Sequence, residues 1–104
     1  MRVRFTPSAR TEFLDALEYI RRDKPSAAVR FRRRVEQGLR RLERFPESGR
    51  SLPEFSDLPH REVIVRPYRF FYRVRGQTVW IVAVWHSAQQ AEPPPETPRR
   101  PTKR

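Results

Sequence analysis

The stretch HREVIVRPYRFFYRV, residues 60–74, decides the fold of this chain. Valine, isoleucine, phenylalanine and tyrosine dominate it, and these residue types favour strands. Pro67 divides the run, and because proline cannot donate to a sheet ladder, the stretch predicts two strands around a turn. A third strand follows, joined to the second by Gly76-Gln77, a pair suited to a tight hairpin. The predicted strands span residues 61–66, 68–75 and 78–86.

The N-terminal half predicts one short strand followed by two helices. Val3 and Phe5 alternate with arginines, as the residues of a half-buried strand do. Thr6 and Pro7 then supply a helix N-cap and a first-turn proline. Two apolar stripes at helical spacing predict an antiparallel helix hairpin over about residues 7–22 and 25–44, packed on the sheet. The stripes consist of Ala9, Phe13, Ala16, Leu17 and Ile20, and of Ala28, Phe31, Val35, Leu39 and Leu42.

These elements predict an α+β domain of order β-α-α-β-β-β, in which an N-terminal strand and a helix hairpin precede a three-stranded antiparallel sheet. At 104 residues the chain is long enough for one core, and we expect the domain to span residues 1–87. Residues 45–60 are expected to form a long loop, either a functional element or a strap with short turns of its own. The tail, residues 88–104, is rich in proline and arginine and is expected to be disordered alone.

The charge balance is strongly basic, with 23 lysines and arginines against 12 acidic residues and a net charge of +11. A field of that sign attracts nucleic acid, phosphate or an acidic protein surface. The chain has no cysteine, and His60 and His86 lie far apart in the sequence, so we expect neither a metal nor a cofactor. No apolar run approaches the roughly 18 residues of a membrane span, and the start lacks a signal peptide's apolar stretch. A cytoplasmic protein without a membrane partner is expected.

Strand alternation divides the predicted sheet into two faces. Phe70, Tyr72 and Val74 share the face that the helices must cover. The other face interleaves apolar residues with arginines. A sheet with helices on one side should expose its second face to solvent, so apolar residues there indicate that something else covers it. Three explanations fit: single-stranded nucleic acid binds there, a partner protein segment docks there, or other residues of the chain fold over it. The predicted partner-binding residues of this face are Arg69, Phe71, Arg73, Trp80, Val82 and Val84.

Metal-independent RNA cleavage is one chemistry that these residues could support. It needs a base for the 2′-hydroxyl, an acid for the leaving oxygen and cations for the phosphate charge. His60 and His86 are the candidate base and acid, although His60 follows a proline in a loop and is expected to be exposed rather than catalytic. Glu62 could be a general base, but beside Arg61 it is expected to form a strand-edge ion pair worth under about 1 kcal/mol. The cations would be Arg61, Arg66 and Arg69.

The order of the elements, with FPESGR at residues 45–50 and PYRFFYRV at residues 67–74, resembles the RelE/ParE superfamily of bacterial type II toxins. The resemblance covers about residues 1–87. It implies a toxin encoded beside a small antitoxin, ParD-like or of another type II kind, that wraps the toxin in a hetero-oligomer. RelE-like members cut messenger RNA in the ribosome with basic residues on the second and third strands, whereas ParE-like members poison DNA gyrase.

The departures from the RelE-like pattern favour the ParE-like members. Arg69 matches a residue with which the RNA-cleaving toxins hold phosphate. Where they place catalytic lysines, this chain has Glu62, Val63 and Ile64, and a carboxylate would repel the scissile phosphate. The resemblance therefore implies a toxin that inhibits gyrase by binding, with no catalytic residue of its own. The alternatives are a RelE/YoeB-like ribosome-dependent mRNA endonuclease and a non-toxic nucleic-acid-binding module. The endonuclease would use Glu62, Arg61, Arg69 and His86.

Overall fold

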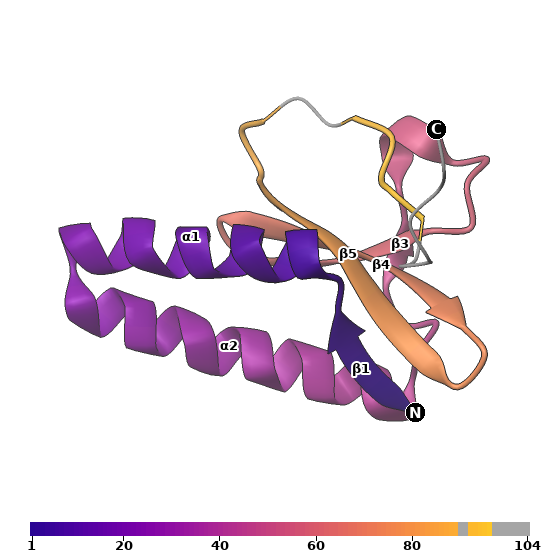
Figure 1. Ribbon diagram of the computed structural model, residues 1–104, viewed down its shortest axis with the longest axis horizontal. Helices are drawn as coiled ribbons and strands as arrows, with labels where there is room; N and C mark the ends of the chain where they lie inside the picture. The colour runs from indigo at the N-terminus through magenta and orange to yellow at the C-terminus, as the bar shows by residue number, and fades with distance from the viewer. Residues whose placement is uncertain (90–91, 97–104) are drawn as a thin grey trace.

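A computed structural model describes residues 1–89 and 92–96 of the chain. Figure 1 shows the two helices side by side, with the sheet beyond them. Within the described part, no helix has the length and apolar character needed to cross a membrane. The elements are β1 (Arg2–Phe5), α1 (Pro7–Asp23), α2 (Pro25–Arg44), β2 (Arg50–Ser51), the 3-10 helix η1 (Pro53–Phe55), β3 (Arg61–Val65), β4 (Tyr68–Arg75) and β5 (Thr78–His86).

The helices begin and end where the sequence places their signals. The Thr6 side chain accepts a hydrogen bond from the Ala9 amide at 3.1 Å, and Pro7 occupies the first turn of α1. Lys24 is the extended residue between the helices, ending α1 and preceding Pro25 at the start of α2. Its backbone N–H still donates to the Ile20 carbonyl, which satisfies one of the free acceptors at the end of α1.

The sheet has five strands in the order β1-β5-β4-β3-β2, so the predicted three-stranded antiparallel sheet is incomplete. β1 pairs in parallel with β5, so the first and last strands of the chain lie side by side. β2 adds a short antiparallel pairing to β3 from within the predicted loop. The β4–β5 hairpin is confirmed, since Arg75 pairs with Thr78 and Gly76 takes the positive φ of 60° that the turn requires.

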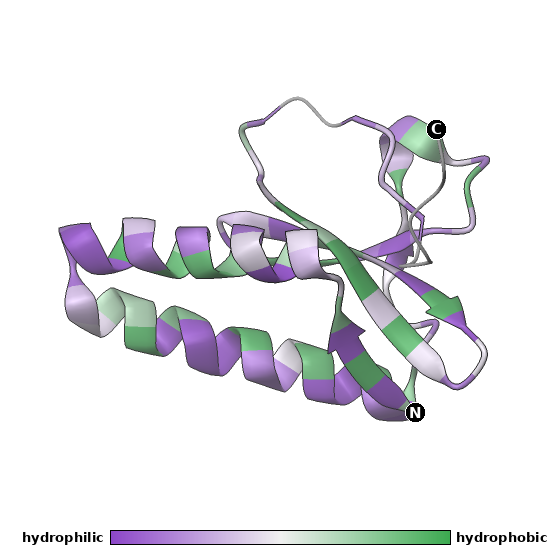
Figure 2. Cartoon of the chain, viewed as in Figure 1, coloured by the Kyte–Doolittle hydropathy of each residue, from purple (hydrophilic) through white to green (hydrophobic). Residues whose placement is uncertain are grey.

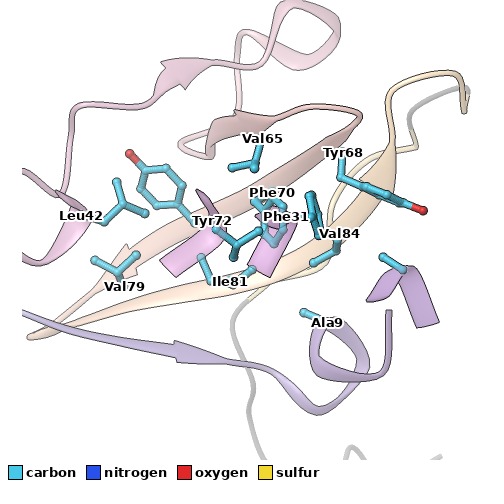
Figure 3. Close-up of a cluster of buried hydrophobic side chains, with 12 residues drawn as sticks. Ala9, Phe31, Leu42, Val65, Tyr68, Phe70, Tyr72, Val79, Ile81 and Val84 are labelled. Atoms are coloured by element: carbon cyan, nitrogen blue, oxygen red, sulfur yellow. The ribbon is translucent and has the colours of Figure 1, made fainter. Parts of the chain in front are cut away.

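One side of the sheet packs against the helices through a core of apolar and tyrosine side chains. Figure 3 shows Phe70 of β4 at Phe31 of α2, with Val84 of β5 near them, whereas the Tyr72 ring extends toward Leu42 of α2. The Phe13 and Phe70 rings lie 5.9 Å apart edge to face, a favoured aromatic geometry. Full burial of each such side chain stabilises the fold by about 1.5–3 kcal/mol. The alternation behind this core is visible in β1, where hydrophilic and hydrophobic residues follow one another in Figure 2.

A β-bulge in β5 changes which side chains face the helices. Phe71 pairs with Ala83 and Tyr72 with Ile81, so Val82 is the extra residue without a partner. An extra residue reverses the facing of everything after it. Val84, predicted on the outer face, therefore packs in the helix-side core. Ala83 and Trp85 move to the outer face instead.

The outer face of the sheet is covered by the segment between α2 and β3. Leu52, fully buried, packs there with Phe71 and Val82, and Phe55 of η1 flanks them. In Figure 1 this segment, drawn in pink, lies on the side of the sheet away from α1 and α2. The expectation of a strap with turns of its own is thus confirmed, as is the explanation that other residues of the chain cover this face.

Candidate functional site

Arg69, predicted to match a phosphate-holding residue of the RNA-cleaving toxins, lies on the outer face of β4 between two carboxylates. Its Nε donates to Glu62 Oε1 at 2.7 Å, while Nη1 and Nη2 donate to the two oxygens of Glu54 at 2.8 and 2.9 Å. The guanidinium carbon stands 4.9 Å from the centre of the Phe71 ring. Only 9% of the side chain is exposed. A phosphate could reach this cation only by displacing a carboxylate that already holds it.

The cluster around Arg69 balances its own charge. Arg50 donates from Nε to the second Glu62 oxygen at 2.5 Å, so two arginines face two carboxylates. The hydrogen bonds from Arg69 lower the pKa of Glu54 to about 2. The same pairing with Glu54, followed by that with Glu62, raises the pKa of Arg69 above its ordinary value. Bidentate arginine–carboxylate pairs are among the strongest polar contacts in proteins, so the cluster fixes η1 onto β3 and β4.

The predicted strand-edge ion pair between Glu62 and Arg61 is wrong, since Glu62 pairs with Arg50 and Arg69. Glu62 is 1% exposed, and adjacent strand residues point to opposite faces, so the two side chains cannot meet. Arg61 instead donates from Nη1 to the Gly49 carbonyl at 2.9 Å, and the Gly49 amide donates to the Tyr72 hydroxyl at 2.9 Å. A Cβ at Gly49 would lie 2.6 Å from that hydroxyl, so only glycine fits this approach.

The residues of the endonuclease alternative do not come together. Glu62 and Arg69 are on the outer face, whereas Arg61 and His86 belong to the positions of β3 and β5 that face the helices. The His86 ring stacks edge to face on Tyr68 with centroids 5.2 Å apart, and its Nδ1 accepts a hydrogen bond from the Ala88 amide. An acid and a base must both reach one substrate, which this division between two faces prevents in the described structure.

His60 was predicted to be exposed, and that prediction is also wrong. His60 is 1% exposed, and its Nε2 lies 3.1 Å from the Pro95 carbonyl oxygen of the tail. Burial lowers the pKa of His60 below its ordinary value, and the nearby Arg73 lowers it further.

The six predicted partner-binding residues differ in how accessible they are. Phe71 and Val82 are buried beneath Leu52, and Val84 belongs to the helix-side core. Arg73 and Trp80 are half-buried at the margin of the outer face. Arg69 is paired with Glu54 and Glu62. Partner contact through these residues remains a prediction, and for the buried ones it requires the covering segment to move.

A basic groove between α2 and the edge of β3 was not predicted from the sequence. It has a volume of about 690 Å³. β2 pairs only with Arg61 and Glu62, so the outer edge of β3 from Val63 to Val65 carries no strand in the described structure. α2 lies close to this edge at Gly38, where a Cβ would make ordinary van der Waals contact with the Val63 side chain at 3.5 Å. Four arginines line the groove: Arg34, Arg41, Arg50 and Arg66.

This groove offers an acidic extended segment both charge and backbone partners. An open strand edge binds an added strand through main-chain hydrogen bonds, and arginines pair with carboxylates. Arg34 and Arg41 could be seen in the sequence, but the edge that completes the groove depends on how far β2 pairs. Among residues 1–89 and 92–96, no cluster of three or more histidine or acidic side chains is arranged to hold a metal.

Comparison with known proteins relates the chain to one family. A family model described as the ParE toxin of the type II toxin-antitoxin system parDE matches residues 3–91. Among solved structures, a chain of the chromosomal ParDE toxin-antitoxin system from P. aeruginosa superposes with a TM-score of 0.67 at 18% sequence identity. The match covers 83% of this chain and 95% of that one, and at this identity it shows a shared fold. A search of curated proteins found no match.

Proposed function

The chain belongs to the ParE family of toxins of type II toxin-antitoxin systems, and we propose that it inhibits DNA gyrase by binding and is neutralised by a cognate antitoxin. Its action would then be cytoplasmic. The similar solved chain comes from a ParDE system, which supports the expectation of an antitoxin partner here.

The observation that carries binding rather than RNA cleavage is the pairing of Arg69. Its three guanidinium nitrogens all donate to Glu54 or Glu62, and the ring of Phe71 lies against it. Stabilising a phosphate in a transition state needs donors that are oriented but free to bind it. An arginine already paired with two carboxylates instead holds η1 against β3 and β4. The position of His86 on the other face supports the same conclusion.

The groove beside β3 is the surface that best fits an acidic antitoxin segment. Arg34, Arg41 and Arg66 line it, and the exposed Ile64 of β3 offers an apolar contact beside the open strand edge. With a net charge of +11, the chain also attracts an acidic partner at long range.

Two assays run together test the target. Induction of the chain should leave messages intact in primer extension, while the purified chain should inhibit purified gyrase in a supercoiling and DNA-cleavage assay. Ribosome-dependent cuts in messages, with gyrase unaffected, would instead establish an mRNA endonuclease. If neither effect is seen, a nucleic-acid-binding module is the better reading, and filter binding with single-stranded RNA and DNA then tests it.

A further inference from the structure

Residues 92–96, with the sequence Glu-Pro-Pro-Pro-Glu, lie against the side of the sheet opposite the helices. They are drawn in yellow in Figure 1, next to the segment that carries η1. Pro94 is buried, although a proline-rich tail would normally be solvated throughout. The other four residues of the segment are exposed. Pro94 is therefore packed against the domain, while its neighbours remain in solvent.

Two side chains of the domain hold this segment. His60 Nε2 lies 3.1 Å from the Pro95 carbonyl oxygen, and Arg73 forms an ion pair with Glu96. His60 immediately precedes β3, whose first residue, Arg61, pairs with Tyr72. Continuing that register by one residue sets His60 opposite Arg73 on the outer face. The hydrogen-bond donor, His60, and the cation, Arg73, therefore lie side by side. The strand pairing of the domain places them there, and the tail does not.

The chemistry of His60 matches a proline segment. A carbonyl oxygen only accepts, so Nε2 carries the proton, and the buried Nδ1 is an acceptor without a partner in the described structure. This ring thus makes one hydrogen bond, to a peptide carbonyl. Polyproline segments expose their carbonyls because they form no internal hydrogen bonds, and they lose little entropy when they bind.

We propose that His60 and Arg73 form a docking site for a short proline-containing peptide that carries a carboxylate, and that the chain's own residues 92–96 occupy this site. The tether from the end of β5 at His86 to Glu92 is short. A short tether gives a millimolar effective concentration, so a site of low intrinsic affinity is filled in cis. A segment of the same chemistry on another protein competes with the tail for the site. The site is separate from the Arg69 cluster and from the groove beside β3.

The reactivity of His60 toward diethyl pyrocarbonate tests the proposal in the full chain, with His86 as an internal reference. In the wild-type chain His60 should react much more slowly than the half-exposed His86. Glu96→Gln removes the ion pair with Arg73 and should accelerate the modification of His60 about two- to fivefold, the range expected for a partly exposed pair. Glu92→Gln is the matched control, because Glu92 is exposed and makes no ion pair in the described structure. It should leave the rate unchanged.

A peptide in trans tests whether the site recognises this chemistry. Millimolar Glu-Pro-Pro-Pro-Glu added to the Glu96→Gln chain should restore the protection of His60, and the same peptide ending in glutamine should not. Rapid modification of His60 in the wild-type chain would overturn the proposal, as would equal rates for the two variants or no protection by the peptide. Neither gyrase nor an antitoxin enters these measurements, so their outcome is independent of the proposed function.

Discussion

The two faces of the sheet each have a buried cluster, but different kinds of segment cover them. On the helix side, two long apolar stripes cover the strands, and every large buried side chain in that core is apolar or a tyrosine. On the outer side, Phe71, Val82 and Leu52 form a small cluster whose margin consists of ion pairs and a histidine. A regular helix presents a continuous apolar surface, whereas an irregular segment must be fixed at particular points by directional polar contacts.

The largest predicted effect is on the free energy of unfolding, when one of two neighbouring phenylalanines on opposite faces of the sheet is replaced. Phe70 faces the helices and Phe71 faces the covering segment, and both are 0% exposed. Replacing either with alanine should lower the free energy of unfolding by about 3–5 kcal/mol, because each leaves a cavity. Chemical denaturation measures the loss, with the exposed Phe45→Ala as a control of small effect. A loss below about 1 kcal/mol for Phe71→Ala alone would mean that the outer face is open in solution.

The second prediction concerns the ion pairs that close the outer face. Arg69→Met leaves the buried Glu62 with Arg50 as its remaining cation and should cost about 3 kcal/mol of stability. Arg66→Met, an exposed arginine just before β4, is the matched control and should change stability by less than about 0.5 kcal/mol. Equal stabilities of the two variants would contradict a structural role for the Arg69 cluster.

The third prediction concerns the edge of β3 from Val63 to Val65, which pairs with no strand in the described structure. Arg41→Glu reverses one charge in the groove beside β3 and should weaken binding of the cognate antitoxin about tenfold, or about 1.4 kcal/mol. Arg40→Glu changes the overall charge equally from an exposed position outside the groove. Calorimetric titration of both variants measures the difference. If the two lose affinity equally, only the net charge matters and the groove is not the binding surface.

The smallest predicted effect is a pH dependence on the outer face. The pKa of Glu54 is lowered to about 2, so in the folded chain this carboxylate stays charged where an unfolded one is protonated. Its contribution is therefore complete above the ordinary carboxyl pKa and is lost as the pH falls toward 2. Because the side chain is 41% exposed, the contribution should stay below about 1 kcal/mol. Glu54→Gln should flatten the stability curve between pH 5 and 2 by about this amount, whereas Glu47→Gln, at an exposed loop position, should not.

The sequence predicted the helix-side face well because local periodicity specifies it. The apolar stripe of α2, which contains Phe31 and Val35, predicts the helix-side core. The alternation of Phe70 and Tyr72 in β4 predicts the same core. The facing of the β5 residues after Val82 was predicted wrongly, because one extra residue reverses strand alternation without any local signal. Glu54 was missed altogether, since its partner Arg69 lies fifteen residues away and only folding of the loop brings them together.

The sequence by itself determined the helices, every strand except β2, the tight turn at Gly76, the basic charge and the family resemblance, because each depends on residues close together in the chain. Only the tertiary structure decided what Arg69, Glu62 and His60 contact. These side chains are buried by a loop and a tail that have no regular periodicity. Their roles therefore depend on contacts between distant segments, which no local pattern encodes.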